Sequence, residues 1–169
     1  MDFDFWRIWV INNIFRIVIL EEKVEQIISK SVAETQKIAA DLAKKLSSGE
    51  ILALSGDLGG GKTTFVQGLA KGLGIKEQIT SPTFVLIKEF KISRSYKLEA
   101  KNLIHIDLYR LKKIDKIFKK EIQEYFKPEN ITVIEWAEKI KDSLPKNTKW
   151  IKFNFISENK RRIKYDFSN

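Results

Sequence analysis

One glycine-rich turn constrains the fold of this chain more than any other feature. The turn reads GDLGGGKTT over residues 56–64, and it follows the short apolar run Ile51–Leu54. It matches the pattern G-x-x-x-x-G-K-[ST], and a helix predicted from about Lys62 to Leu73 follows it. An apolar strand, such a turn and a helix together are typical of a phosphate-binding loop. The residues expected at a bound nucleotide are Gly56, Asp57, Leu58, Gly59, Gly60, Gly61, Lys62, Thr63 and Thr64.

Each residue type in the turn has a chemical reason to be there. Glycine permits positive φ and close approach, so backbone N–H groups can surround a phosphate chain. The helix that follows adds its positive N-terminal end. Lys62 can reach the β- and γ-phosphates, and the Thr63 hydroxyl can ligate Mg²⁺. A guanine-reading motif with its aspartate is missing at residues 148–151 and 159–162, which favours ATP.

The pattern of apolar residues predicts an α/β fold. Ser31 and Glu34 form a capping box for a helix that ends at residues 47–49. Further expected elements are strands at 23–28, 51–54, 84–90, 103–106 and 131–134, a helix at 114–126, a basic loop or hairpin at 91–102, and an antiparallel pair at 150–156 and 163–167. Because helices alternate with short buried strands, we expect a sheet covered by helices on both faces.

Two carboxylates stand at the ends of predicted strands. Asp107 follows Leu103–Ile106, and Glu135 follows Ile131–Ile134. Ligands of open α/β sheets bind at the carboxyl ends of the strands, so both side chains would reach the phosphates if these strands run parallel to the strand before the turn. Asp107 is then a Walker-B-like Mg²⁺ ligand, and Glu135 a second ligand or the residue that orients water. His105 is expected to be a core histidine that is hydrogen-bonded to a neighbour.

Composition excludes several classes of site. The chain has no cysteine and one histidine, which rules out disulfides, iron–sulfur clusters and multi-histidine metal sites. Its net charge is +9, and residues 88–120 hold eleven basic against four acidic side chains. This basic strip could contact tRNA or an acidic partner protein. Because 25 of the 31 basic residues are lysine, biased composition with solvated lysines explains the charge equally well.

The first twenty residues differ from the rest of the chain. They are mostly apolar, but Arg7, Asn12, Asn13 and Arg16 interrupt them, so they predict no transmembrane segment. Their acidic start is unlike a secretory signal. We therefore expect an N-terminal apolar extension over 1–20, to which no role is assigned, and a single domain over 21–169.

Four motifs in sequence order make the chain resemble the TsaE (YjeE) family. They are GDLGGGKTTF at 56–65, SPTF at 81–84, HIDLYRL at 105–111 and IEW at 134–136. The resemblance implies a P-loop NTPase-like mixed sheet and a cytoplasmic ATPase of tRNA threonylcarbamoyladenosine biosynthesis. It also implies ATP and Mg²⁺ as cofactors and the TsaD–TsaB transferase pair as partners. The modified tRNAs would be those that read codons beginning with A.

The resemblance also assigns roles to single residues. Lys62, Asp107 and Glu135 would be catalytic, and Thr63, Asp107 and Glu135 would be at the metal. Three further residues would bind the nucleotide: Thr83 in a switch-like loop, Thr35 near the base, and Arg162, which would match an arginine near the C-terminus. One departure is at 115–121, where the family usually has an acidic pair and then a glycine, and this chain has Asp115, Lys116 and Glu121.

Two other functions remain open from the sequence. A small-molecule kinase would also use a P-loop, but it needs an arginine-bearing lid, and residues 112–120 contain only lysines as basic side chains. A nucleotide-dependent RNA-binding module without turnover would account for the basic second half of the chain.

Overall fold

Four parallel strands form the centre of a seven-stranded sheet with the order β1-β7-β6-β2-β5-β4-β3. The computed structural model describes residues 25–80, 86–93 and 99–166. Strand β2 (Ile51–Gly56) pairs in parallel with β5 (Asn130–Glu135) and β6 (Lys149–Ser157), and β4 (Asn102–Asp107) pairs in parallel with β5. This confirms that the strands carrying Asp107 and Glu135 run in the same direction as the strand before the glycine-rich turn.

Antiparallel strands complete both edges, so the sheet is mixed. At one edge, β3 (Ile87–Lys91) pairs antiparallel with β4. At the other edge, β7 (Lys160–Asp166) pairs antiparallel with β6, as expected for the C-terminal pair, and β1 (Glu25–Ser29) pairs with β7. The pairing of β1 with β7 joins the first described residues to the last ones, which no local pattern in the sequence could indicate.

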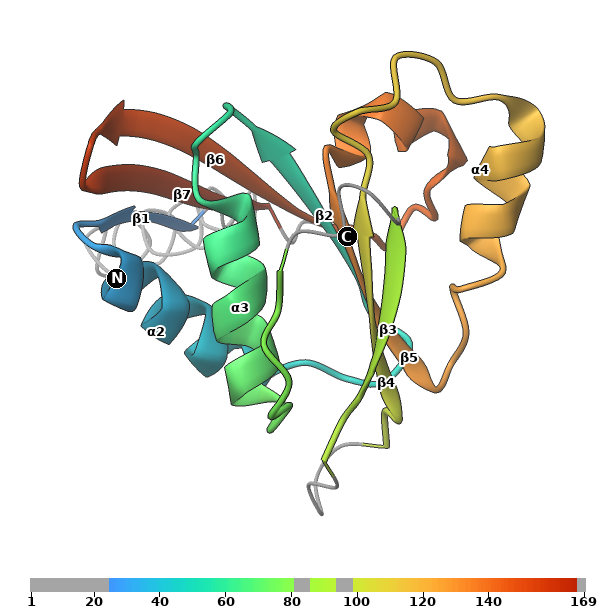
Figure 1. Ribbon diagram of the computed structural model, residues 1–169, viewed down its shortest axis with the longest axis horizontal. Helices are drawn as coiled ribbons and strands as arrows, with labels where there is room; N and C mark the ends of the chain where they lie inside the picture. Colours follow the sequence, from blue (N-terminus) through green and yellow to red (C-terminus); the bar gives the residue numbers. More distant parts are fainter. Residues whose placement is uncertain (1–24, 81–85, 94–98, 167–169) are drawn as a thin grey trace, which may run out of the picture.

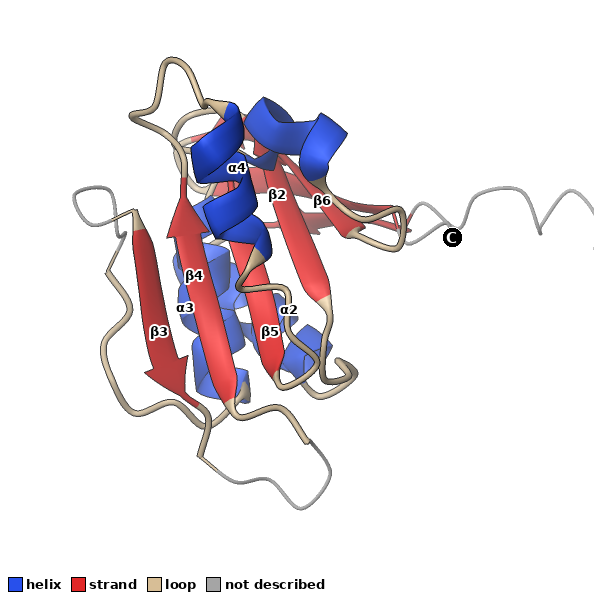
Figure 2. Cartoon of the chain, turned by 90° about the vertical axis from the view of Figure 1, so that its right-hand side faces the viewer, coloured by secondary structure: helices blue, strands red, loops and turns tan. Residues whose placement is uncertain are grey.

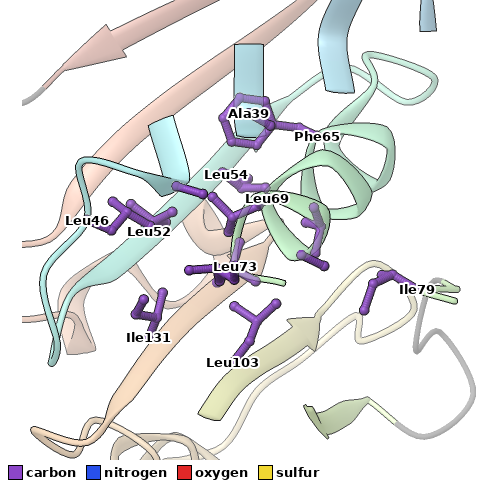
Figure 3. Close-up of a cluster of buried hydrophobic side chains, with 14 of the residues drawn as sticks. Ala39, Leu46, Leu52, Leu54, Phe65, Leu69, Leu73, Ile79, Leu103 and Ile131 are labelled. Atoms are coloured by element: carbon purple, nitrogen blue, oxygen red, sulfur yellow. The ribbon is translucent and has the colours of Figure 1, made fainter. Parts of the chain in front are cut away.

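Helices cover both faces of this sheet (Figures 1 and 2). On one face lie α2 (Val32–Ala43) and α3 (Lys62–Gly72), and on the other lie α4 (Lys116–Gln123) and the 3-10 helix η1 (Ala137–Ser143). Alternate side chains of each strand pack against the helices on opposite faces of the sheet. Leu52 and Leu54 of β2 pack under α2 and α3 (Figure 3), whereas Ile51 and Ala53 pack under α4 and η1.

Several elements differ in their bounds from the sequence prediction, and the helices differ most clearly. Helix α2 ends at Ala43, before the expected stop at residues 47–49, although Leu46 after its end is still buried. Helix α4 covers 116–123 instead of 114–126, because the Asp115 carboxylate accepts a hydrogen bond from the Phe118 N–H and so fixes the first turn. The 3-10 helix η1 was not expected at all.

The described lysines of the basic strip expected at residues 88–120 lie on more than one face of the sheet. Lys88 lies on the sheet face that α3 covers, where its ammonium is 5.5 Å from the centre of the Phe90 ring. The lysines of α4 belong to the opposite face, since Ile122 of α4 packs into the other core. The lysines around α4 and Lys88 therefore cannot contact one flat partner surface together.

Candidate functional site

The glycine-rich turn connects the carboxyl end of β2 to the first turn of α3. Gly56 has φ +112°, and a Cβ atom there would lie 1.9 Å from the carbonyl oxygen of Phe153 in β6. Any side chain at this position would therefore push the turn away from β6. Gly61 has φ +95° and precedes the first helical residue without a side-chain cap. The first N–H groups of α3 have no partners within the helix, and they are available to an anion.

Lys62 is a buried cation at the centre of the turn, with 4% of its surface exposed. Its ammonium donates hydrogen bonds of 2.8 Å to the carbonyl oxygens of Gly56 and Asp57 and lies 3.8 Å from the centre of the Trp136 ring. None of the ion pairs between described residues includes Lys62. Burial lowers the pKa of this ammonium below its ordinary value, although nearby carboxylates, chiefly Glu135, act in the opposite direction. The site is suited to an anion that would complete the lysine's coordination.

Asp107 and Glu135 lie side by side at the ends of β4 and β5, where they form a register pair. Both are buried, at 3% and 2% exposure. Glu135 Oε2 accepts a 2.9 Å hydrogen bond from the Thr63 hydroxyl of α3. Asp107 Oδ1 accepts one of 3.0 Å from the backbone N–H of Tyr109. The sequence-based expectation that these strand ends converge on the turn agrees with this geometry.

His105 holds the other oxygen of Glu135. Its Nε2 lies 2.9 Å from Glu135 Oε1, and the ring is fully buried. His105 Nδ1 has no hydrogen-bond partner among the described residues, so the proton is assigned to Nε2, which donates to the carboxylate. The histidine is therefore a core residue bonded to a neighbour, as expected, but that neighbour is the candidate catalytic carboxylate.

These groups line one pocket of about 480 Å³. Its walls comprise Ser31, Val32, Thr35, Leu58, Gly59, Gly60, Gly61, Lys62, Thr63, Thr64, Asp107, Tyr109, Arg110, Glu135, Trp136, Glu158, Asn159 and Arg161. Thr35 is thus at the pocket, where its hydroxyl lies 2.7 Å from that of Ser29. Thr83 lies outside the described residues. The pocket is large enough for a small-molecule ligand, and charged side chains form part of its wall.

The structure places Arg161, and not Arg162, at the pocket. Arg162 is exposed and does not line it. Successive side chains of a strand point to opposite faces, and Arg161 shares its face with the buried Ile163 and Tyr165. The alternation of apolar and polar side chains along β7 was therefore a signal in the sequence that could have distinguished the two arginines.

Lys139 is a second functional candidate that the sequence did not indicate. From η1, its ammonium donates to the carbonyl oxygens of Leu108, Tyr109 and Leu111, at 2.8, 2.6 and 3.0 Å. These carbonyls belong to the loop that follows Asp107. Lys139 therefore holds that loop against η1, next to the pocket.

Two features are absent from the described parts of the chain. No group of three or more His, Cys, Asp or Glu side chains is arranged to hold a metal ion there. Every helix in those residues is too short or too polar to span a lipid bilayer.

Comparisons with known proteins agree on one family. The family model described as "Threonylcarbamoyl adenosine biosynthesis protein TsaE" matches residues 29–163. Proteins named "tRNA threonylcarbamoyladenosine biosynthesis protein TsaE" are similar over most of their length. The one from Treponema pallidum is 35% identical over 80% of this chain and 96% of its own. The one from Bacillus subtilis is 37% identical over 78% of each chain.

A solved structure gives the same result. The crystal structure of Bacillus subtilis YdiB superposes with a TM-score of 0.69 at 30% sequence identity, over 88% of this chain and 90% of that one. This likeness confirms the mixed α/β fold that the motifs predicted.

Proposed function

This chain belongs to the TsaE family of tRNA threonylcarbamoyladenosine biosynthesis proteins, and on that premise we propose that it binds ATP with Mg²⁺ and hydrolyses the ATP. We further propose that it does so in the cytoplasm with a TsaD–TsaB transferase pair. The hydrolysis would sustain modification of the tRNAs that read codons beginning with A.

The observation that carries the proposal is the environment of Lys62. A buried ammonium normally has a carboxylate partner, because an uncompensated buried charge costs several kcal/mol by order of magnitude. Lys62 instead has two carbonyl oxygens and an aromatic face. Phosphate oxygens would give this ammonium directly bonded anionic partners, and charge-assisted hydrogen bonds to them are strong. The unpaired N–H groups at the start of α3 support the same ligand.

The oxygens of Thr63, Asp107 and Glu135 suit Mg²⁺, which prefers hard oxygen ligands. We propose that these three residues hold the ion, directly or through water. When bound, Mg²⁺ would neutralise charge that develops on the phosphate oxygens. Because His105 and Thr63 each bond one Glu135 oxygen, the carboxylate is held in one orientation at the pocket wall. Such fixed groups stabilise a transition state without having to reorganise.

The decisive experiment measures phosphate release from Mg·ATP by the chain alone and with the TsaD–TsaB pair. We expect slow release by the chain alone and stimulation by the pair. ADP formation that depends on an added metabolite would identify a kinase instead. Binding of RNA that depends on nucleotide, without phosphate release, would identify an RNA-binding module.

The control for that experiment is Lys62→Ala. Removal of the ammonium should abolish ATP binding, because several kcal/mol of charged hydrogen bonding are lost, by order of magnitude. Unchanged ATP affinity in a folded Lys62→Ala variant would refute the phosphate site.

A further inference from the structure

We infer that Arg161 is a positioning residue for the phosphate loop, and that it ties nucleotide affinity to the β6–β7 hairpin. This rests on the proposed function, since it concerns how the same pocket holds the phosphates of a nucleotide. The hairpin tip lies between β6 and β7 at residues 157–160, far from the loop in sequence but next to it in space. Glu158, Asn159 and Arg161 from this segment line the same pocket as Gly59–Thr64.

Arg161 fixes one peptide group of the loop. Its Nε donates a 2.7 Å hydrogen bond to the carbonyl oxygen of Gly59. The N–H of the same peptide unit, on Gly60, donates a 3.0 Å hydrogen bond to the carbonyl oxygen of Asp57. Both ends of the Gly59–Gly60 peptide are therefore held. Gly59 has φ +71°, and no atom lies within 4 Å of the position that a Cβ atom would take there. The peptide would therefore rotate more freely without Arg161.

The arginine is itself held rigidly. Its Nη1 donates to the carbonyl oxygens of Ser157, Glu158 and Lys160 at 2.6, 3.1 and 3.0 Å. The guanidinium also lies 4.6 Å from the centre of the Phe155 ring. These contacts orient the planar guanidinium and leave little freedom to lose when a ligand binds.

The hairpin and the loop are joined at further points. The Asp57 N–H donates to the Phe153 carbonyl oxygen at 3.1 Å, and Asp57 Oδ2 accepts from the Phe155 N–H at 2.9 Å. The loop is thus anchored to β6 at its start and to the hairpin, through Arg161, at its middle. A displacement of the hairpin would change the position of the phosphate-binding N–H groups.

One nitrogen of Arg161, with its two N–H donors, remains for the ligand. Nη2 makes no hydrogen bond with any residue in the described ranges, although Arg161 lines the pocket. The Cγ atom of Arg161 would lie 3.6 Å from a Cβ atom on Gly61, so the side chain passes directly beside the loop. A guanidinium at this place suits a phosphate oxygen.

The test compares Arg161→Ala and Arg161→Lys with the matched control Arg162→Ala. Arg162 is the next residue of the same strand, carries the same charge and is exposed away from the pocket. We expect Arg161→Ala to weaken ATP binding and to raise the KM for ATP by tenfold or more, with a much smaller effect on kcat at saturating ATP. Lysine should restore only part of the affinity. It keeps the positive charge, but it cannot hydrogen-bond to the loop and to the hairpin at the same time. Arg162→Ala should behave as the wild type.

Inorganic tripolyphosphate, which lacks the base and the ribose, separates this role from contact with the nucleoside. We expect Arg161→Ala to lose affinity for tripolyphosphate and ATP by similar factors. Loss for ATP alone would place Arg161 at the nucleoside and overturn the inference. Wild-type affinity for both ligands in Arg161→Ala would also overturn it. If the wild type itself fails to bind ATP, the proposed function fails, which is a distinguishable result.

Discussion

The hydroxyl of Thr63 and the carboxylate of Glu135 are joined by a 2.9 Å hydrogen bond, although the two residues are 72 positions apart. The bond connects the first turn of α3 to the end of β5. Both groups carry oxygen atoms of the kind that Mg²⁺ prefers as ligands, and the hydrogen bond places them next to each other. His105 completes the arrangement by holding the other oxygen of Glu135 at 2.9 Å.

The Glu135→Gln variant should separate nucleotide binding from hydrolysis. Glutamine keeps the size of the side chain and can still bond Thr63, but it removes the negative charge at the proposed metal site. We expect phosphate release with the partners present to fall by about 10²-fold or more, within the range for loss of a preorganised charged group. ATP affinity should change much less. Hydrolysis at the wild-type rate in this variant would refute a catalytic role for Glu135.

ATP binding should weaken as the pH rises in the alkaline range. Burial lowers the pKa of Lys62 in the free protein, so its ammonium loses its proton below the ordinary lysine value of about 10.4. The phosphates bind the charged form, and affinity therefore falls as the pH rises through the lowered pKa. Calorimetric titrations of ATP from neutral pH up to the ordinary lysine pKa of about 10.4 should show this fall together with proton uptake on binding. An affinity that is constant over this range would contradict the prediction.

Gly68→Ala should destabilise the fold without touching the pocket. A Cβ atom on Gly68 of α3 would lie 2.3 Å from the carbonyl oxygen of Gln36 in α2, so the two helices would have to separate. We expect a loss of about 1–3 kcal/mol in the free energy of unfolding, measured by denaturant titration. Lys37→Ala, on the exposed side of the partner helix α2, is the control and should stay within about 0.5 kcal/mol of the wild type. Equal stability of the two variants would contradict the predicted close approach.

The lysines around α4 should contribute to partner assembly and not to ATP binding. Lys112, Lys113, Lys116 and Lys120 are exposed around Ile117, which is itself 79% exposed. Replacing the four lysines by glutamine should weaken assembly with the TsaD–TsaB pair, and wild-type assembly should weaken with added salt, because exposed charges are screened over about 8–10 Å.

A matched control removes four exposed lysines elsewhere, at 30, 37, 45 and 76. It should assemble like the wild type. If both fourfold variants assemble equally well across a salt series, the lysines of α4 are solvated surface.

The sequence predicted the part of the site that local patterns encode. The glycine-rich turn and the lysine that follows it are contiguous. Asp107 and Glu135 could be placed at the site because each follows an apolar strand, and ligands of open α/β sheets bind at the carboxyl ends of the parallel strands. The distances between the carboxylates and Thr63 depend on the sheet register, which the sequence did not specify.

The residues that the sequence missed make non-local contacts. Arg161 bonds a carbonyl oxygen 102 positions away, and Lys139 bonds carbonyl oxygens 28 to 31 positions away. A basic side chain that bonds backbone carbonyls leaves no motif, because any residue supplies a carbonyl. The pairing of β1 with β7 also leaves no motif in the sequence, because it joins backbone groups.

The most direct test reconstitutes tRNA modification with purified TsaC, TsaD, TsaB, ATP and this chain, and measures threonylcarbamoyladenosine in the tRNA over many turnovers. The wild type should sustain its formation. Glu135→Gln should bind ATP and fail to sustain it, because hydrolysis at this site is the proposed contribution of the chain. If Glu135→Gln, or a reaction without this chain, forms as much modified tRNA as the wild type, the central claim is wrong.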